Sequence, residues 1–248
     1  MNAKSRQSGL TLMEQTVVVA CIAALVVLGL PAVRTFVKSF ESQGSTKAMI
    51  SAALASARAV AAKEQHYAGI RFQHRYHEDG KGSQYIIFIL HDFDKTELAN
   101  GFRAVEGIEP IKLPDAVGAM EVIDRDSDID DEDKVTDKTT FSIVFSPAGK
   151  MVIHDVRTRN RDGETNNTSE DDIFNTETNV QVNKIGMFVQ DYRDGSGNHP
   201  QEELSKNSFR IYDRNLFEKV DVNRRYSDYL EHLEAIYINP YTGTMIER

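Results

Sequence analysis

A single acidic residue, Glu14, stands in a long run of uncharged residues from Leu10 to Val33. At about 1.5 Å per residue, a helix over this run is long enough to cross the hydrocarbon core of a bilayer. An ionised side chain near the end of such a helix costs roughly 2–4 kcal/mol, so it needs a partner or a function. This one residue therefore constrains both the fold of the chain and its role.

A short basic leader, residues 1–9, precedes the run, with Lys4 and Arg6 and no acidic residue. The positive-inside rule then predicts a cytoplasmic N-terminus and export of everything after Val33. A cleaved secretory signal or a plain signal anchor would share the basic start and the apolar stretch. Both explanations are weaker, because several polar residues lie in the first third of the run and an anchor gives Glu14 no partner.

The sequence of residues 9–14, GLTLME, is followed by apolar residues and Pro31. This pattern resembles the N-terminal signal of type IV pilins and type II secretion pseudopilins. The resemblance implies that a prepilin peptidase cleaves between Gly9 and Leu10 and methylates the new amino terminus on Leu10. Glu14 is then the fifth residue of the mature chain and Pro31 the twenty-second, as in the family. Leu10 stands where the family most often has phenylalanine.

Such cleavage gives Glu14 a partner. It creates a positive amine on Leu10, which the Glu14 carboxylate of a neighbouring subunit can neutralise in apolar surroundings. The pair would also set the axial register between subunits. The resemblance therefore implies a structural subunit rather than an enzyme. Its implied partners are prepilin peptidase, other pilin or pseudopilin subunits and an inner-membrane assembly platform, and its implied location is the bacterial inner membrane, crossed once, with an exported domain.

An amphipathic helix is predicted over residues 46–63, which are rich in alanine and other helix formers. Apolar residues recur in it at spacings of three to four, at Ile50, Leu54, Ala57 and Ala61. Together with the apolar run it predicts one long N-terminal helix, bent near Pro31.

The alanine-rich end of this helix and the strand-like residues after it, within 57–72, resemble minor pseudopilins of the GspH/FimT type. A minor pseudopilin of a type II secretion system is preferred for this reason and because the exported domain is large. The alternatives are a type IV pilus minor pilin and, from another class, a membrane-tethered periplasmic enzyme or ligand-binding protein whose helix is only a tether.

The predicted fold class is α+β, with a long hydrophobic N-terminal helix packed on an antiparallel β-sheet domain. The predicted organisation is a leader over 1–9, a helix over 10–66 with its membrane span at 10–33, and a β-rich exported domain over 67–248. Short apolar runs bounded by turn residues predict strands in that domain. These runs are 69–76, 85–90, 120–123, 141–145, 151–155, 185–190, 209–212, 235–239 and 244–247.

Two β-hairpins are predicted with the most local detail, over 141–153 and 235–246. In each, a proline fixes one turn dihedral and a glycine permits a positive φ. A short helix is predicted over 226–234. Two polar segments, 124–138 and 157–178, are predicted as exposed loops because they are dense in acidic and amide residues.

The net charge of −9 argues against nucleic acid as a partner, because phosphate binding requires a basic surface. An oxygen-rich loop that begins at Asp191 is a weak candidate calcium site, with Asp191, Asp194 and Asn198 as ligands, and a solvated loop without a metal ion is the favoured alternative. No other cofactor is predicted. A metal site on His74 and His77 is disfavoured relative to surface histidines, and no local catalytic signature supports an enzyme.

Overall fold

The computed structural model describes five parts of the chain, residues 44–77, 82–122, 140–164, 167–191 and 203–247. The leader, the predicted span 10–33 and the acidic segment 124–138 lie outside these parts. So do the predicted processing and assembly residues Gly9, Leu10, Glu14 and Pro31.

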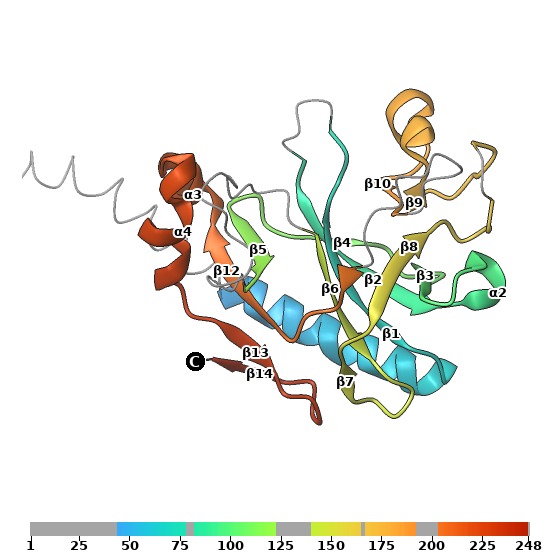
Figure 1. Cartoon of the computed structure of the whole chain (residues 1–248), viewed down its shortest axis with the longest axis horizontal. Coiled ribbons are helices and arrows are strands. Elements are labelled where there is room, and N and C mark those ends of the chain that lie inside the picture. Colours follow the sequence, from blue (N-terminus) through green and yellow to red (C-terminus); the bar gives the residue numbers. More distant parts are fainter. Residues whose placement is uncertain (1–43, 78–81, 123–139, 165–166, 192–202, 248) are drawn as a thin grey trace, which may run out of the picture. The chain divides into compact units, whose positions relative to one another are not determined.

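Strands make up most of the described secondary structure, and residues 44–64 form a helix that lies along them (Figure 1). The strands are β1 (Ala68–His74), β2 (Gln84–His91), β3 (Gly101–Ala104), β4 (Ile111–Lys112), β5 (Val117–Glu121), β6 (Phe141–Phe145), β7 (Met151–Val152), β8 (Asp155–Arg159), β9 (Phe174–Asn175), β10 (Phe188–Val189), β11 (Glu203–Leu204), β12 (Ser208–Asp213), β13 (Ile236–Ile238) and β14 (Met245–Glu247). The short helical elements are α2 (Phe93–Thr96), η1 (Asn179–Asn183), α3 (Arg214–Lys219), η2 (Val222–Arg224), α4 (Arg225–Asp228) and η3 (Leu230–His232).

The larger sheet has the strand order β11-β8-β3-β2-β1-β6-β7, with β4 paired to β2, and it is visibly curled (Figure 1). Its centre is antiparallel, since β1 pairs with both β2 and β6 in that direction. The pairing of β3 with β8 is parallel, so the sheet is mixed. A second sheet has the order β14-β13-β12-β5, and β9 and β10 form a small parallel pair.

One face of the larger sheet packs against helix 44–64. Ile50 and Leu54 of the helix are fully buried there, together with alternate residues of the central strands such as Ile70, Ile86 and Ile143. The smaller sheet contributes to the same core through β5, β12 and β13. The alternation follows from the strand geometry, because successive side chains point to opposite faces.

The opposite face of the larger sheet has its own apolar cluster. Ile87 and Ile89 of β2 pack there with Val144 of β6 and with the phenylalanines of β9 and β10, Phe174 and Phe188. Both faces of β2 are therefore covered, which explains its nearly continuous apolar sequence.

The predicted fold class is wrong. The described chain is mostly β, its main sheet is curled and mixed rather than antiparallel, and the helical elements after residue 64 are short. The helix 44–64 is amphipathic: it buries an apolar stripe against the sheet, while Lys63 lies on its exposed side. That stripe reflects packing on a domain core rather than insertion into lipid.

The predicted single-pass inner-membrane location is corrected as well. Within the residues that the structure describes, no helix combines the length and the apolar character needed to cross a bilayer. The run 10–33, on which the prediction depended, is not among them.

Both predicted hairpins are confirmed as antiparallel pairs, β6 with β7 and β13 with β14. Their turns place Gly149 and Gly243 at φ values of +71°, which favours glycine at both positions. The predicted helix over 226–234 is instead two shorter turns, α4 and η3, which bury Leu230 against the smaller sheet.

Candidate functional site

Among the predicted calcium ligands, Asp191 alone lies in the described part of the chain; Asp194 and Asn198 lie outside it. Asp191 Oδ1 accepts a hydrogen bond of 2.7 Å from Arg71, and Oδ2 accepts bonds of 2.9 Å from the backbone amide and the hydroxyl of Thr158. Both carboxylate oxygens are thus engaged by protein donors. Over the described residues, no group of three or more side chains is arranged to hold a metal ion.

Arg71 is a buried cation in the middle of the larger sheet, with 1% of its surface exposed. Besides Asp191 it donates to Glu203 at 2.9 Å, to Gln73 at 2.8 Å and to Ser142 at 3.3 Å. The guanidinium therefore links residues of β1, β6 and β11 to Asp191, which follows β10. A buried arginine whose donor atoms bond to several partners has a structural role, because it holds those partners together.

Burial raises the pKa of the Glu203 carboxyl, and the nearby charges of Asp191 and Glu121 add to the shift, whereas Arg71 opposes it. Although Glu203 contacts Arg71, it shares that cation with Asp191. The effect of burial on the pKa of Glu203 exceeds that of the ion pair, because the single Arg71 guanidinium serves two partly buried carboxylates.

The histidines are spread over separate environments. His74 Nδ1 lies 2.8 Å from the Gly82 carbonyl oxygen and 3.5 Å from the Arg214 guanidinium, a cation that disfavours a metal ion at the same nitrogen. His77 instead lines a surface cavity. His91 and His154, which carried no prediction, have ring centroids 6.0 Å apart in an aromatic cluster. Each ring donates a hydrogen bond to a backbone carbonyl oxygen, which indicates a packing role.

The polar segment 157–178 was predicted as an exposed loop, yet much of it is internal. Asp171 is 5% exposed, and burial raises the pKa of its carboxyl despite bonds from the Arg161 and Ile173 amides. Asn175 donates to the Asp171 carbonyl oxygen at 2.9 Å. Asn179, also buried, donates to the Asn175 side chain at 2.9 Å. The amide and acidic residues of this segment therefore satisfy one another inside the domain.

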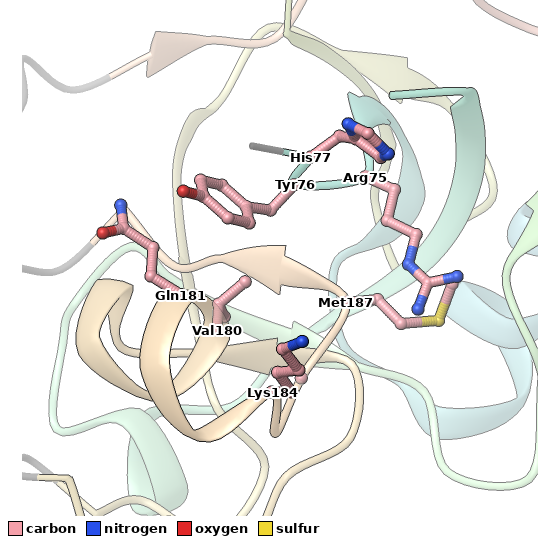
Figure 2. A pocket seen from close by; sticks show the side chains of 8 residues that line it. Arg75, Tyr76, His77, Val180, Gln181, Lys184 and Met187 are labelled. Atoms are coloured by element: carbon pink, nitrogen blue, oxygen red, sulfur yellow. The ribbon is translucent and has the colours of Figure 1, made fainter. Parts of the chain in front are cut away.

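A cavity of about 240 Å³ opens between the residues that follow β1 and the segment from η1 to β10 (Figure 2). Arg75, Tyr76 and His77 line it from one side, and Gln181 and Lys184 line it from the other. Three of these five side chains are basic. The basic and aromatic residues at 75–77 were visible in the sequence, whereas the second wall comes from a distant part of the chain.

A second polar contact site, the Arg58 junction, connects helix 44–64 to the turns of both hairpins. Arg58 donates from Nε to the Gly149 carbonyl oxygen and from a terminal nitrogen to the Thr242 carbonyl oxygen, each at 2.8 Å. Near the start of the same helix, Lys47 forms an ion pair of 2.5 Å with Glu247 of β14. The helix is therefore attached to both sheets by polar contacts as well as by its apolar stripe.

The comparisons with known proteins identify no family for this chain: no protein-family model matches it, and no match was found among curated proteins or solved structures.

Proposed function

We propose that the chain is a pilin-like structural subunit, of the minor pseudopilin kind, that prepilin peptidase processes and that then joins a filament of a type II secretion system or a related pilus. The observation that carries the proposal is the sequence GLTLME at residues 9–14, followed by an uncharged run to Val33. In this interpretation the peptidase cleaves between Gly9 and Leu10 and methylates Leu10.

The attachment of helix 44–64 supports the proposal. A filament that is held together through N-terminal segments needs each folded domain to follow its own segment closely. Here Ile50 and Leu54 are fully buried in the domain core, and Arg58 bonds to the turns of two hairpins. The helix is thus an integral part of the domain, as the proposal requires of a subunit that is attached to a filament through its N-terminal segment.

The chemistry of assembly follows from one charge pair. Cleavage exposes an ammonium group on Leu10, and Glu14 is the acidic residue of the apolar run that follows. Between neighbouring subunits these charges neutralise each other in apolar surroundings, where either charge alone would be costly. The proposed partners are accordingly prepilin peptidase and further pilin or pseudopilin subunits.

The test is the substitution Glu14→Ala in the native host, with Gln15→Ala as the matched control in the adjacent polar position. Intact mass spectrometry should show that all three proteins begin at methylated Leu10, because the cleavage site is unchanged. Cross-linking to other filament subunits should fall at least tenfold in Glu14→Ala and stay at the wild-type level in the control.

Two results would overturn the proposal. A wild-type chain that keeps residues 1–9, or that begins beyond Val33, excludes processing by the prepilin pathway. Undiminished cross-linking of Glu14→Ala excludes the charge pair as the basis of assembly.

A further inference from the structure

The cavity between residues 75–77 and the η1–β10 segment has a basic lining in an acidic protein. Arg75, His77 and Lys184 line it, and none of the described residues that line it is acidic. The whole chain, by contrast, has 38 acidic residues against 29 lysines and arginines. The positive charges of Arg75 and Lys184 in one hollow repel each other, and an anion between them relieves that repulsion.

The two walls of the cavity are held together by the backbone. The Tyr76 amide donates to the Met187 carbonyl oxygen at 3.1 Å, which joins the end of β1 to the residues before β10. Lys184 has a left-handed φ of 55°, and the amide of Ile185 donates to the Asn179 carbonyl oxygen at 3.0 Å, which closes η1. The backbone conformation at Lys184 is therefore fixed by hydrogen bonds within the protein and does not need a bound ligand.

The buried amides described above support the same wall. Asn179 begins η1, and its side chain is bonded to Asn175, which in turn is bonded to the Asp171 carbonyl oxygen. Gly186 approaches this support so closely that a Cβ there would lie 2.7 Å from the Cβ of Asn175. The internal polar network of segment 157–178 thus fixes the position of the wall that carries Lys184.

We propose that this cavity binds a small organic or inorganic anion that bears a phosphate or carboxylate group. The planar guanidinium of Arg75 suits two oxygens of such a group, and the Lys184 ammonium supplies a further donor. Tyr76 and Gln181 face each other on the other side of the hollow in Figure 2, where a hydroxyl and an amide can contact an uncharged part of the ligand.

The size of the cavity limits the ligand. Its volume of about 240 Å³ is smaller than the roughly 300–1,000 Å³ of sites for drug-sized ligands. A phosphate ion or a molecule of the size of citrate fits this space. The proposal goes beyond filament assembly and does not depend on it.

Binding can be tested by isothermal titration calorimetry on the purified full chain, with inorganic phosphate and citrate in separate titrations and sodium chloride at matched ionic strength as the blank. We expect saturable binding of at least one anion, and the stronger of the two identifies the preferred group. The double variant Arg75→Gln/Lys184→Gln should lose affinity at least tenfold. The matched double variant Lys95→Gln/Lys219→Gln, which removes two exposed lysines elsewhere, should bind as the wild type does.

The proposal is overturned if neither anion gives saturable binding to the wild type, or if both double variants lose affinity equally, since the effect is then one of net charge. Circular dichroism checks that each variant is folded. If the double variant is not, the single change Lys184→Gln at an exposed position takes its place, with an expected loss of at least threefold.

Discussion

The two faces of the larger sheet are stabilised in different ways. The face under helix 44–64 is covered by a regular apolar stripe, in which Ile50 and Leu54 meet the alternate residues of β1, β2 and β6. The opposite face combines an apolar cluster with buried polar groups, among them Arg71, Asp171 and Asn175. On the first face burial itself supplies the stabilisation, whereas on the second each polar group must also find its partner.

The two faces therefore differ in how strongly a small shift of a neighbouring residue weakens their contacts. An apolar contact keeps most of its value when a neighbour shifts slightly, because the hydrophobic effect has no direction. A buried guanidinium such as that of Arg71 depends on four particular partners at hydrogen-bonding distance. The second face therefore specifies the arrangement of β8 to β11 more strictly than the helix specifies the first face.

The largest effect is expected from Arg71→Leu, which keeps the apolar stem but removes the cation from the second face. It leaves Asp191 and Glu203 without their shared partner, and we expect the free energy of unfolding to fall by roughly 3–5 kcal/mol. Urea denaturation measures this loss. The control is Lys63→Gln, which breaks an ion pair whose lysine is 81% exposed and should leave the free energy of unfolding nearly unchanged. Equal losses in both variants would show that the network does not stabilise the second face.

On the first face, Leu54→Ala should destabilise the domain by about 3 kcal/mol, because it leaves a cavity between the helix and the sheet. Leu54 is fully buried, whereas Ala55 beside it is exposed. Ala55→Ser is thus the control, and we expect its effect to stay within about 0.5 kcal/mol. Urea denaturation again provides the measurement. A Leu54→Ala loss as small as that of the control would mean that the helix contributes little to the core.

The smallest effect concerns pH and Glu203. Its pKa is raised above the ordinary 4.5, so the folded state binds the proton more tightly than the unfolded state does. Stability from this group is present below pH 4.5 and is lost as the pH rises through the raised pKa, with a slope of at most about 1.4 kcal/mol per pH unit. Glu203→Gln should remove that slope, and above this window the variant should be at least as stable as the wild type.

Thermal denaturation between pH 4 and pH 8 tests this expectation, with the exposed Glu218→Gln as the control that keeps the slope. A Glu203→Gln protein that is less stable than the wild type at neutral pH would instead show that the charged pair with Arg71 dominates.

The first face was largely predictable from the sequence. The spacing of Ile50, Leu54, Ala57 and Ala61 predicted the helix that the structure shows, since one apolar stripe per turn is a local signal. The strands β1, β2 and β6 and both hairpins were likewise found from alternation and from proline and glycine in the turns. These features depend on residues that are close together in the chain.

The second face was not predictable, because its signals are distant from one another. The strand β3 has four residues and pairs in parallel with β8, a match that no local pattern reveals. Arg71 meets Asp191 and Glu203 from positions 120 and 132 residues away. Composition marked segment 157–178 as polar, but composition does not show whether amides bond to water or to one another. The anion cavity was missed for the same reason, since its two walls are far apart in sequence.

The Arg58 junction has a consequence for biosynthesis. The guanidinium of Arg58 and the carbonyl of Thr242 are separated by 184 residues, and Lys47 and Glu247 by 200. The ribosome makes the helix well before the β13–β14 hairpin that contacts it. The helix therefore stays partly uncovered until these residues have been made, and the part of its apolar stripe that meets β12 and β13 is open to chaperones until then.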